Sequence, residues 1–123
     1  MAGKQILMID DEADFIESIK NSLQRHGYEV HTAANGEEGL KKFAEVRPDV
    51  VFLDIMMPKM DGFQVLRRLR ESLPGTEDIP IIMFTGKRDS ASIFKSMDYK
   101  VTDFIMKPCT VKELLDVLNK YIV

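Results

Sequence analysis

Several residue types that support particular chemistries are scarce in this sequence. Its 123 residues include one Cys, two His and no Trp. A single cysteine cannot form an intramolecular disulfide, and it excludes a zinc site built on cysteines. No apolar run reaches the ~18 residues that a membrane-spanning helix needs, and the first residues lack the pattern of a signal peptide. These absences favour a soluble, cytoplasmic protein with no membrane insertion.

The composition is that of one ordinary globular domain, which we expect to cover residues 1–123. Hydrophobic residues make up 45% and charged residues 30% of the chain, a balance that argues against disorder. The 20 acidic and 17 basic residues give a net charge of −3. This charge argues against direct binding of nucleic acid, which usually requires a strongly basic face.

Short apolar runs alternate along the chain with segments whose apolar residues recur at helical spacing. The first run, residues 6–9, is continuous, as in a strand that is buried on both faces. This alternation predicts an α/β fold, a doubly wound parallel sheet with helices on both faces. The predicted strands cover residues 6–9, 28–33, 50–53, 79–84 and 102–106, and the predicted helices lie near residues 15–26, 36–47, 63–73, 88–98 and 111–122.

Polar side chains follow four of the predicted strands. In strand order they are Asp10, Asp11, Asp54, Thr85 and Lys107. Because ligands of such sheets bind beyond the carboxyl ends of the strands, we expect these side chains to share one site. Three carboxylates and one ammonium leave a charge of −2, which one divalent cation would cancel. Oxygen ligands favour Mg²⁺, and Mn²⁺ has a similar preference.

The residues at the strand ends form a set that is suited to phosphoryl transfer. Asp54 is the candidate nucleophile because it ends the strand expected at the centre of the sheet. Lys107 and the metal would hold the negative oxygens, and the Thr85 hydroxyl would donate a hydrogen bond. Glu12 is interpreted as an acid in the first turn of the following helix rather than as a metal ligand.

The strand-end residues also belong to longer motifs. These are Asp10-Asp11-Glu12, residues 54–62 (DIMMPKMDG), Thr85-Gly86 and residues 104–108 (FIMKP). With these motifs in this order, the chain resembles, over nearly its whole length, the receiver domain of bacterial two-component response regulators. The resemblance implies a single flavodoxin-like (βα)5 domain whose parallel sheet has the order 2-1-3-4-5.

The resemblance also implies roles for individual residues. Asp54 would accept a phosphoryl group from the phosphohistidine of a sensor histidine kinase or a phosphotransfer protein. Asp11 and Asp54 would bind Mg²⁺ directly, Asp10 would act mainly through a water, and the backbone carbonyl of Met56 would complete the set. Lys107 would pair with the phosphoryl oxygens. The domain would then be a signalling phosphoacceptor rather than an enzyme that acts on other substrates.

Phosphorylation is expected to shift the domain between two packings. The resemblance implies that Thr85 moves to the phosphoryl group and that Phe104 turns inward into the vacated space. The peptide bond between Lys107 and Pro108 is expected to be cis. The face formed by residues 88–121 would then meet a downstream protein that the sequence does not identify.

The sequence departs from the family pattern at several positions. Lys100 and Val101 stand where Gly-Ala is common, and Cys109 stands where an aromatic residue is frequent. Phe104 replaces a frequent Tyr, so only its packing role carries over. Met56, two residues after the nucleophile, cannot orient an attacking water as an amide or acid can. We therefore expect slow self-dephosphorylation.

Four alternatives stand beside this interpretation. An aspartate-nucleophile phosphatase of the haloacid-dehalogenase type would need a second Asp where Met56 stands. A flavin-binding electron carrier would need a Ser/Thr/Gly-rich loop where Asp10, Asp11 and Glu12 would repel the flavin phosphate. A pseudo-receiver that acts without phosphorylation stays open, as does a receiver cut from a longer regulator or hybrid kinase.

Overall fold

Five strands and four helices are found in the residues that the structure, a computed structural model, describes: 3–72, 75, 77–86 and 101–122. The strands are β1 (Gln5–Ile9), β2 (Glu29–Ala33), β3 (Val50–Asp54), β4 (Ile81–Thr85) and β5 (Asp103–Met106). The helices are α1 (Ala13–Arg25), α2 (Gly36–Val46), α3 (Gly62–Ser72) and α5 (Val111–Tyr121). The helix expected over residues 88–98 lies outside the described residues.

The strands form one parallel sheet with the order β2-β1-β3-β4-β5, which confirms the predicted topology. β3 lies at the centre and is buried along its whole length, as its continuous apolar run indicates. Because all strands run in the same direction, their carboxyl ends meet at one edge. At that edge Asp54 pairs with Phe84, and Thr85 pairs with Met106.

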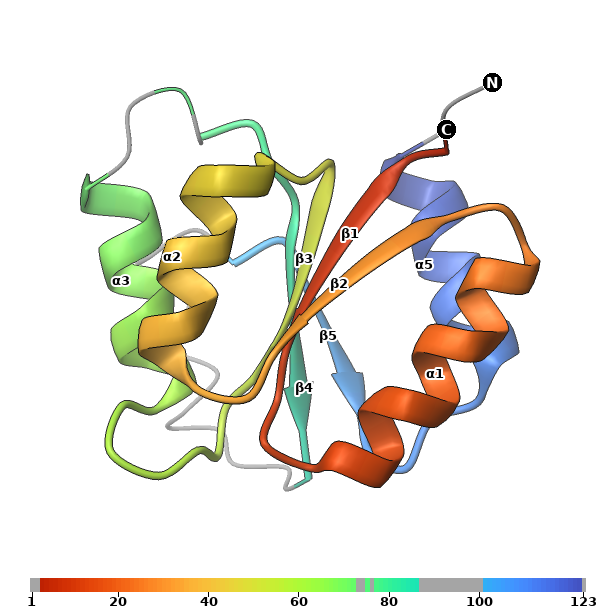
Figure 1. Ribbon diagram of the computed structural model, residues 1–123, viewed down its shortest axis with the longest axis horizontal. Helices are drawn as coiled ribbons and strands as arrows, with labels where there is room; N and C mark the ends of the chain where they lie inside the picture. The colour runs from red at the N-terminus through yellow and green to blue at the C-terminus, as the bar shows by residue number, and fades with distance from the viewer. Residues whose placement is uncertain (1–2, 73–74, 76, 87–100, 123) are drawn as a thin grey trace.

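Helices cover both faces of the sheet, with α2 and α3 on one side and α1 and α5 on the other (Figure 1). Successive side chains of a strand point to opposite faces, so a single apolar run serves two cores. Leu7 and Ile9 of β1 pack in the cluster under α2 and α3, whereas Ile6 and Met8 pack in the cluster under α1 and α5.

The ends of the elements follow local backbone chemistry. Thr110 and Glu113 form a capping box at the start of α5. At α2 the Asn35 side chain accepts the Glu38 N–H at 2.9 Å, but the Glu38 carboxylate accepts from a different N–H than a capping box requires.

The fourth strand begins two residues later than expected, at Ile81. The residue before it is Pro80, which has no N–H to offer a neighbouring strand. The peptide bond between Lys107 and Pro108, just past β5, is cis as expected. Across the described part of the chain, no helix combines the length and the hydropathy that crossing a membrane requires.

Candidate phosphoacceptor and metal site

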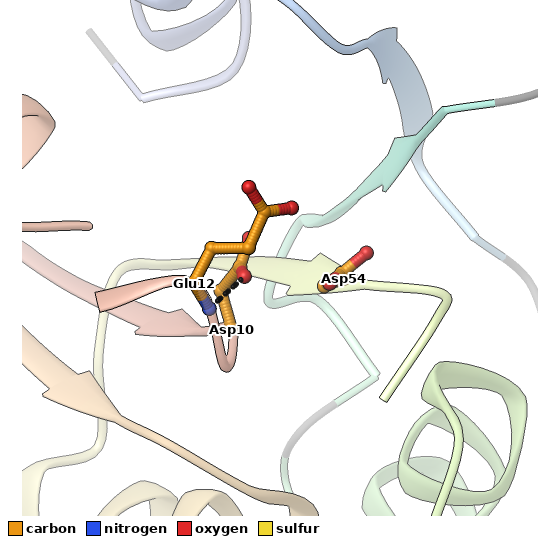
Figure 2. A group of neighbouring side chains, drawn as sticks. All are labelled: Asp10, Glu12 and Asp54. Carbon is orange, nitrogen blue, oxygen red and sulfur yellow. Dashed lines mark hydrogen bonds between the residues drawn. The ribbon is translucent and has the colours of Figure 1, made fainter. Parts of the chain in front are cut away.

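The turn between β1 and α1 carries two of the acidic side chains. Asp10 directly follows β1 and is buried. Its Oδ1 accepts the backbone N–H of Glu12 at 2.9 Å, which closes a short turn (Figure 2). Glu12 is the N-terminal capping residue of α1. Its carboxylate therefore starts from the same turn as that of Asp10.

Asp54 approaches these acids from the neighbouring strand. It is the last residue of β3, and only 4% of it is exposed. Its Oδ1 accepts the backbone N–H of Met56 at 3.2 Å. Carboxylate oxygens of Asp10, Glu12 and Asp54 lie within 4.8 Å of one another (Figure 2). The parallel sheet has thus brought two strand ends together at one acidic site.

Lys107, which directly follows β5, supplies the positive charge. Its Nζ lies 2.6 Å from Asp10 Oδ2, 2.8 Å from Glu12 Oε1 and 3.6 Å from Asp54 Oδ2. The ammonium also lies 4.6 Å from the centroid of the Phe15 ring and 5.7 Å from that of Phe84. Aromatic faces favour a cation at such distances, so the lysine is held by both charge and packing.

The environment changes the acid–base properties of the site. Burial is the main cause that raises the pKa of Asp54 to about 6, and the charge of Asp10 adds to it. The ammonium of Lys107 and the Met56 N–H oppose this rise. Burial also lowers the pKa of Lys107, but its close contacts and ion pairs with Asp10 and Glu12 outweigh burial and raise that pKa overall. The lysine therefore stays charged.

The donor set fits a hard divalent cation. Asp10 Oδ2 is buried and accepts no hydrogen bond of regular geometry in the described structure, although it is ion-paired with Lys107. Three carboxylates against one ammonium leave a charge of −2 at this point. Carboxylate oxygens are the ligands that Mg²⁺ prefers, and a nearby Mg²⁺ would satisfy the unbonded oxygen.

Asp11 and Glu12, two acids of the turn after β1, lie differently with respect to the cluster. Asp11 is exposed and lies outside the group of three close carboxylates, although its charge raises the pKa of Asp54. Glu12 does belong to that group, and its carboxylate accepts a hydrogen bond from the Lys107 ammonium. The interpretation of Glu12 as a first-turn acid alone is therefore incomplete. The sequence signal for this placement of Glu12 is its position two residues after Asp10, directly before the start of a helix.

The remaining predicted residues surround this cluster. Thr85 ends β4 beside the site, and its side chain lies outside the described structure. Phe104 is half-buried and packs against the core cluster under α2 and α3. Met56 follows β3 with a largely exposed side chain.

The fold and the site together define a class of protein. A doubly wound parallel sheet carries a partly buried acidic cluster and a lysine at its carboxyl edge, which suits a domain that binds a cation and an oxyanion there. A family model described as the response regulator receiver domain matches residues 6–119. The chain belongs to this family, and is a receiver domain of two-component response regulators.

Curated relatives extend beyond this chain. The chain is 42% identical over 111 residues to the probable transcriptional regulator ycf27 of Cyanophora paradoxa, covering 90% of the chain and 45% of the relative. It is 36% identical over 112 residues to the transcriptional regulatory protein PhoP of Bacillus subtilis, covering 91% and 45%. The chain thus spans less than half the length of these regulators.

Solved receiver domains share the fold over nearly their full length. The chemotaxis protein CheY4 of Vibrio cholerae is 30% identical, with a TM-score of 0.92 over 98% of this chain and 100% of that one. A response regulator receiver domain protein of Clostridium thermocellum is 34% identical, with a TM-score of 0.86 over 97% and 94%.

Proposed function

We propose that this domain is a phosphorylation-dependent switch in which Asp54 accepts a phosphoryl group from the phosphohistidine of a sensor histidine kinase or phosphotransfer protein. The observation that carries this proposal is the placement of Asp54. Its carboxylate ends the central strand, is nearly buried, and lies beside Asp10 and 3.6 Å from the ammonium of Lys107. A nucleophile and a cation for the transferred oxygens are therefore adjacent.

The transfer step follows from this arrangement. A carboxylate oxygen of Asp54 attacks the phosphorus and forms a P–O bond while the P–N bond of the donor breaks. The electron pair of that bond remains on the imidazole nitrogen, which takes a proton from water. Lys107 pairs with the phosphoryl oxygens, and Thr85 at the end of β4 donates its hydroxyl hydrogen to them.

The proposed metal set combines the sequence and the site. When bound, Mg²⁺ would neutralise carboxylate and phosphoryl oxygens and so favour attack by one anion on another. Asp11 and Asp54 would hold it directly, Asp10 mainly through a water, and the backbone carbonyl of Met56 would add a further oxygen. Glu12 offers one more carboxylate at the same place. Mn²⁺ has similar ligand preferences and would substitute.

The proposed output is a shift of packing near β5. Phosphorylation would draw Thr85 toward the phosphoryl group and bias Phe104 toward the interior, where it already contacts the cluster under α2 and α3. The face within residues 88–121 would then bind a downstream protein. In a longer regulator that partner could equally be a further domain of the same chain, since this sequence spans under half of its curated relatives.

Intact mass tests the proposal. The protein is incubated with acetyl phosphate or phosphoramidate, whose P–N bond resembles that of phosphohistidine, with Mg²⁺ or with EDTA. We expect a Mg²⁺-dependent gain of one phosphoryl group that Asp54→Asn abolishes. Asp116→Asn is the matched control, because Asp116 is an exposed carboxylate of α5 that does not belong to the acidic cluster. A folded protein that gains no phosphoryl group from either donor would contradict the proposal and favour the pseudo-receiver.

A further inference from the structure

Two methionines are the large hydrophobic side chains that stand exposed in the described structure. Met56 is 67% exposed and Met106 is 41% exposed. Both lie beside the phosphoacceptor site, Met56 two residues after Asp54 and Met106 directly before Lys107. Met57, the next residue along from Met56, is only 8% exposed. The three thioethers therefore differ widely in their accessibility to an oxidant in solution.

Met56 is also tied to the acceptor carboxylate. Its backbone N–H donates a hydrogen bond to Asp54 Oδ1 at 3.2 Å. The residue whose backbone N–H contacts the nucleophile thus carries an exposed side chain.

We propose that Met56 is an oxidation site, and that its conversion to the sulfoxide shortens the lifetime of phosphorylated Asp54. The effect on lifetime rests on the proposed function, whereas the modification itself does not. Met106 is the secondary oxidation site, and Met57 is protected by burial.

The modification balances with peroxide as the oxidant. The sulfur lone pair of Met56 attacks one peroxide oxygen, the O–O bond breaks, and the remaining oxygen leaves as water after taking up a proton. Sulfur is oxidised by two electrons and the peroxide is reduced by two. The product is a sulfoxide, which thiol-dependent reductases reverse, so the change suits a signal.

The sulfoxide supplies what the thioether lacks. A thioether sulfur is a weak hydrogen-bond acceptor, whereas the sulfoxide oxygen is polar and holds water well. Water held beside Asp54 is placed to attack the phosphorus of the aspartyl phosphate. That attack forms a P–O bond to water, breaks the P–O bond to Asp54, and releases inorganic phosphate. Oxidation of Met56 therefore speeds dephosphorylation.

Cys109 is the competing target for peroxide and must be removed from the test. It is the single cysteine of the chain and is half-buried. Burial raises the pKa of its thiol, which keeps it in the less reactive protonated form. The experiments therefore use a Cys109→Ala background.

The first experiment reads the order of oxidation by peptide mass after dilute hydrogen peroxide. We expect Met56 to oxidise first, Met106 second and Met57 last, with Met56 at least about five-fold faster than Met57 because thioether oxidation follows exposure. Oxidation of Met57 as fast as Met56 would overturn the proposed site. This measurement needs no phosphorylation, so its result does not depend on the proposed function.

The second experiment follows loss of the phosphoryl group after the donor is removed. Each protein is compared with its own untreated sample. We expect decay about three-fold faster after peroxide in the Met106→Leu variant and no change after peroxide in the Met56→Leu variant. Equal decay before and after oxidation of Met56 would overturn the effect on lifetime. Failure of Asp54 to be phosphorylated at all would instead overturn the proposed function.

Discussion

Asp54 is a carboxylate that the folded chain holds at an energetic cost. The pKa of this group rises from its ordinary value of 3.8 to about 6, chiefly because it is buried and also because Asp10 is near. Between these two pH values the native state binds more protons than the unfolded state does. Stability therefore falls as pH rises through about 4 to 6, and the cost is complete at pH 7.

Replacing this charge is expected to stabilise the fold. A shift of about two pKa units corresponds to at most about 3 kcal/mol. We expect Asp54→Asn to raise the free energy of unfolding by about 1–3 kcal/mol at pH 7 in EDTA, and by much less at pH 4, where the native carboxyl is protonated. Urea unfolding at both pH values measures this difference. The exposed Asp116→Asn control should change stability by under about 0.5 kcal/mol, and an equal gain in both variants would refute the argument.

Some residues of the site could be named from the sequence, and others could not. Asp10, Asp54 and Lys107 could be named because each directly follows or ends a strand of a parallel sheet. The contact of Glu12 with the site could not be predicted, because it depends on the direction in which an exposed carboxylate in a turn points. That direction is set by Lys107, which lies 95 residues away in the chain.

The loop between β3 and α3 holds the end of β3, and with it Asp54, in position. It returns on itself so that the N–H of Gly62 donates to the carbonyl of Ile55 at 2.9 Å. A Cβ at Gly62 would lie 2.4 Å from the backbone oxygen of Asp54 and 2.7 Å from the Cα of Ile55. These are backbone atoms, which cannot rotate away, so the loop requires glycine here.

We therefore expect Gly62→Ala to displace the end of β3. The overlap is with backbone, so the substitution should cost about 2 kcal/mol or more and slow phosphorylation of Asp54 at least about ten-fold. Thermal unfolding and the rate of mass gain with acetyl phosphate measure the two effects. Gly86→Ala is the matched control, because no atom of the residues that the structure describes lies within 4 Å of a Cβ at Gly86. If Gly62→Ala unfolds with the stability of the wild type, the loop accommodates a Cβ at this position and the prediction is wrong.

Elements were predicted well where the local pattern and the tertiary packing agree. The helix that Thr110 caps and the central strand over residues 50–53 both appear within a residue or so of the prediction. The fourth strand was predicted too long, since Ile79 is apolar but precedes a proline. Apolar character alone does not identify which residues have a partner strand.

The whole molecule brings charges together that would repel in an open chain. Three chain segments, ending at β1, β3 and β5, meet only because the sheet has the order β2-β1-β3-β4-β5. The folded state therefore presents an acidic cluster, suited to a cation, that the unfolded chain lacks. Any ion that binds this site stabilises the fold through mass action.

Magnesium is expected to raise the melting temperature for this reason. At a Mg²⁺ concentration of about 100 times its dissociation constant the gain is about 2.7 kcal/mol, or roughly 10 °C for a domain of this size. Chelation by EDTA should reverse it. Thermal unfolding over a Mg²⁺ titration measures the shift, with Asp10→Asn and Asp54→Asn expected to lose most of it and Asp116→Asn to keep it. Equal shifts in all four proteins would mean that the ion binds elsewhere.

The sequence by itself determined the class of fold, the strand ends that carry chemistry and the family to which the chain belongs. These follow from local properties, namely the period of apolar residues and the residue types just after each strand. Only the tertiary structure decided that Lys107 contacts Asp10 and Glu12 more closely than Asp54, and that Met56 is exposed while Met57 is buried. Such features depend on distances between segments far apart in the chain and on how the loops pack, neither of which a local pattern contains.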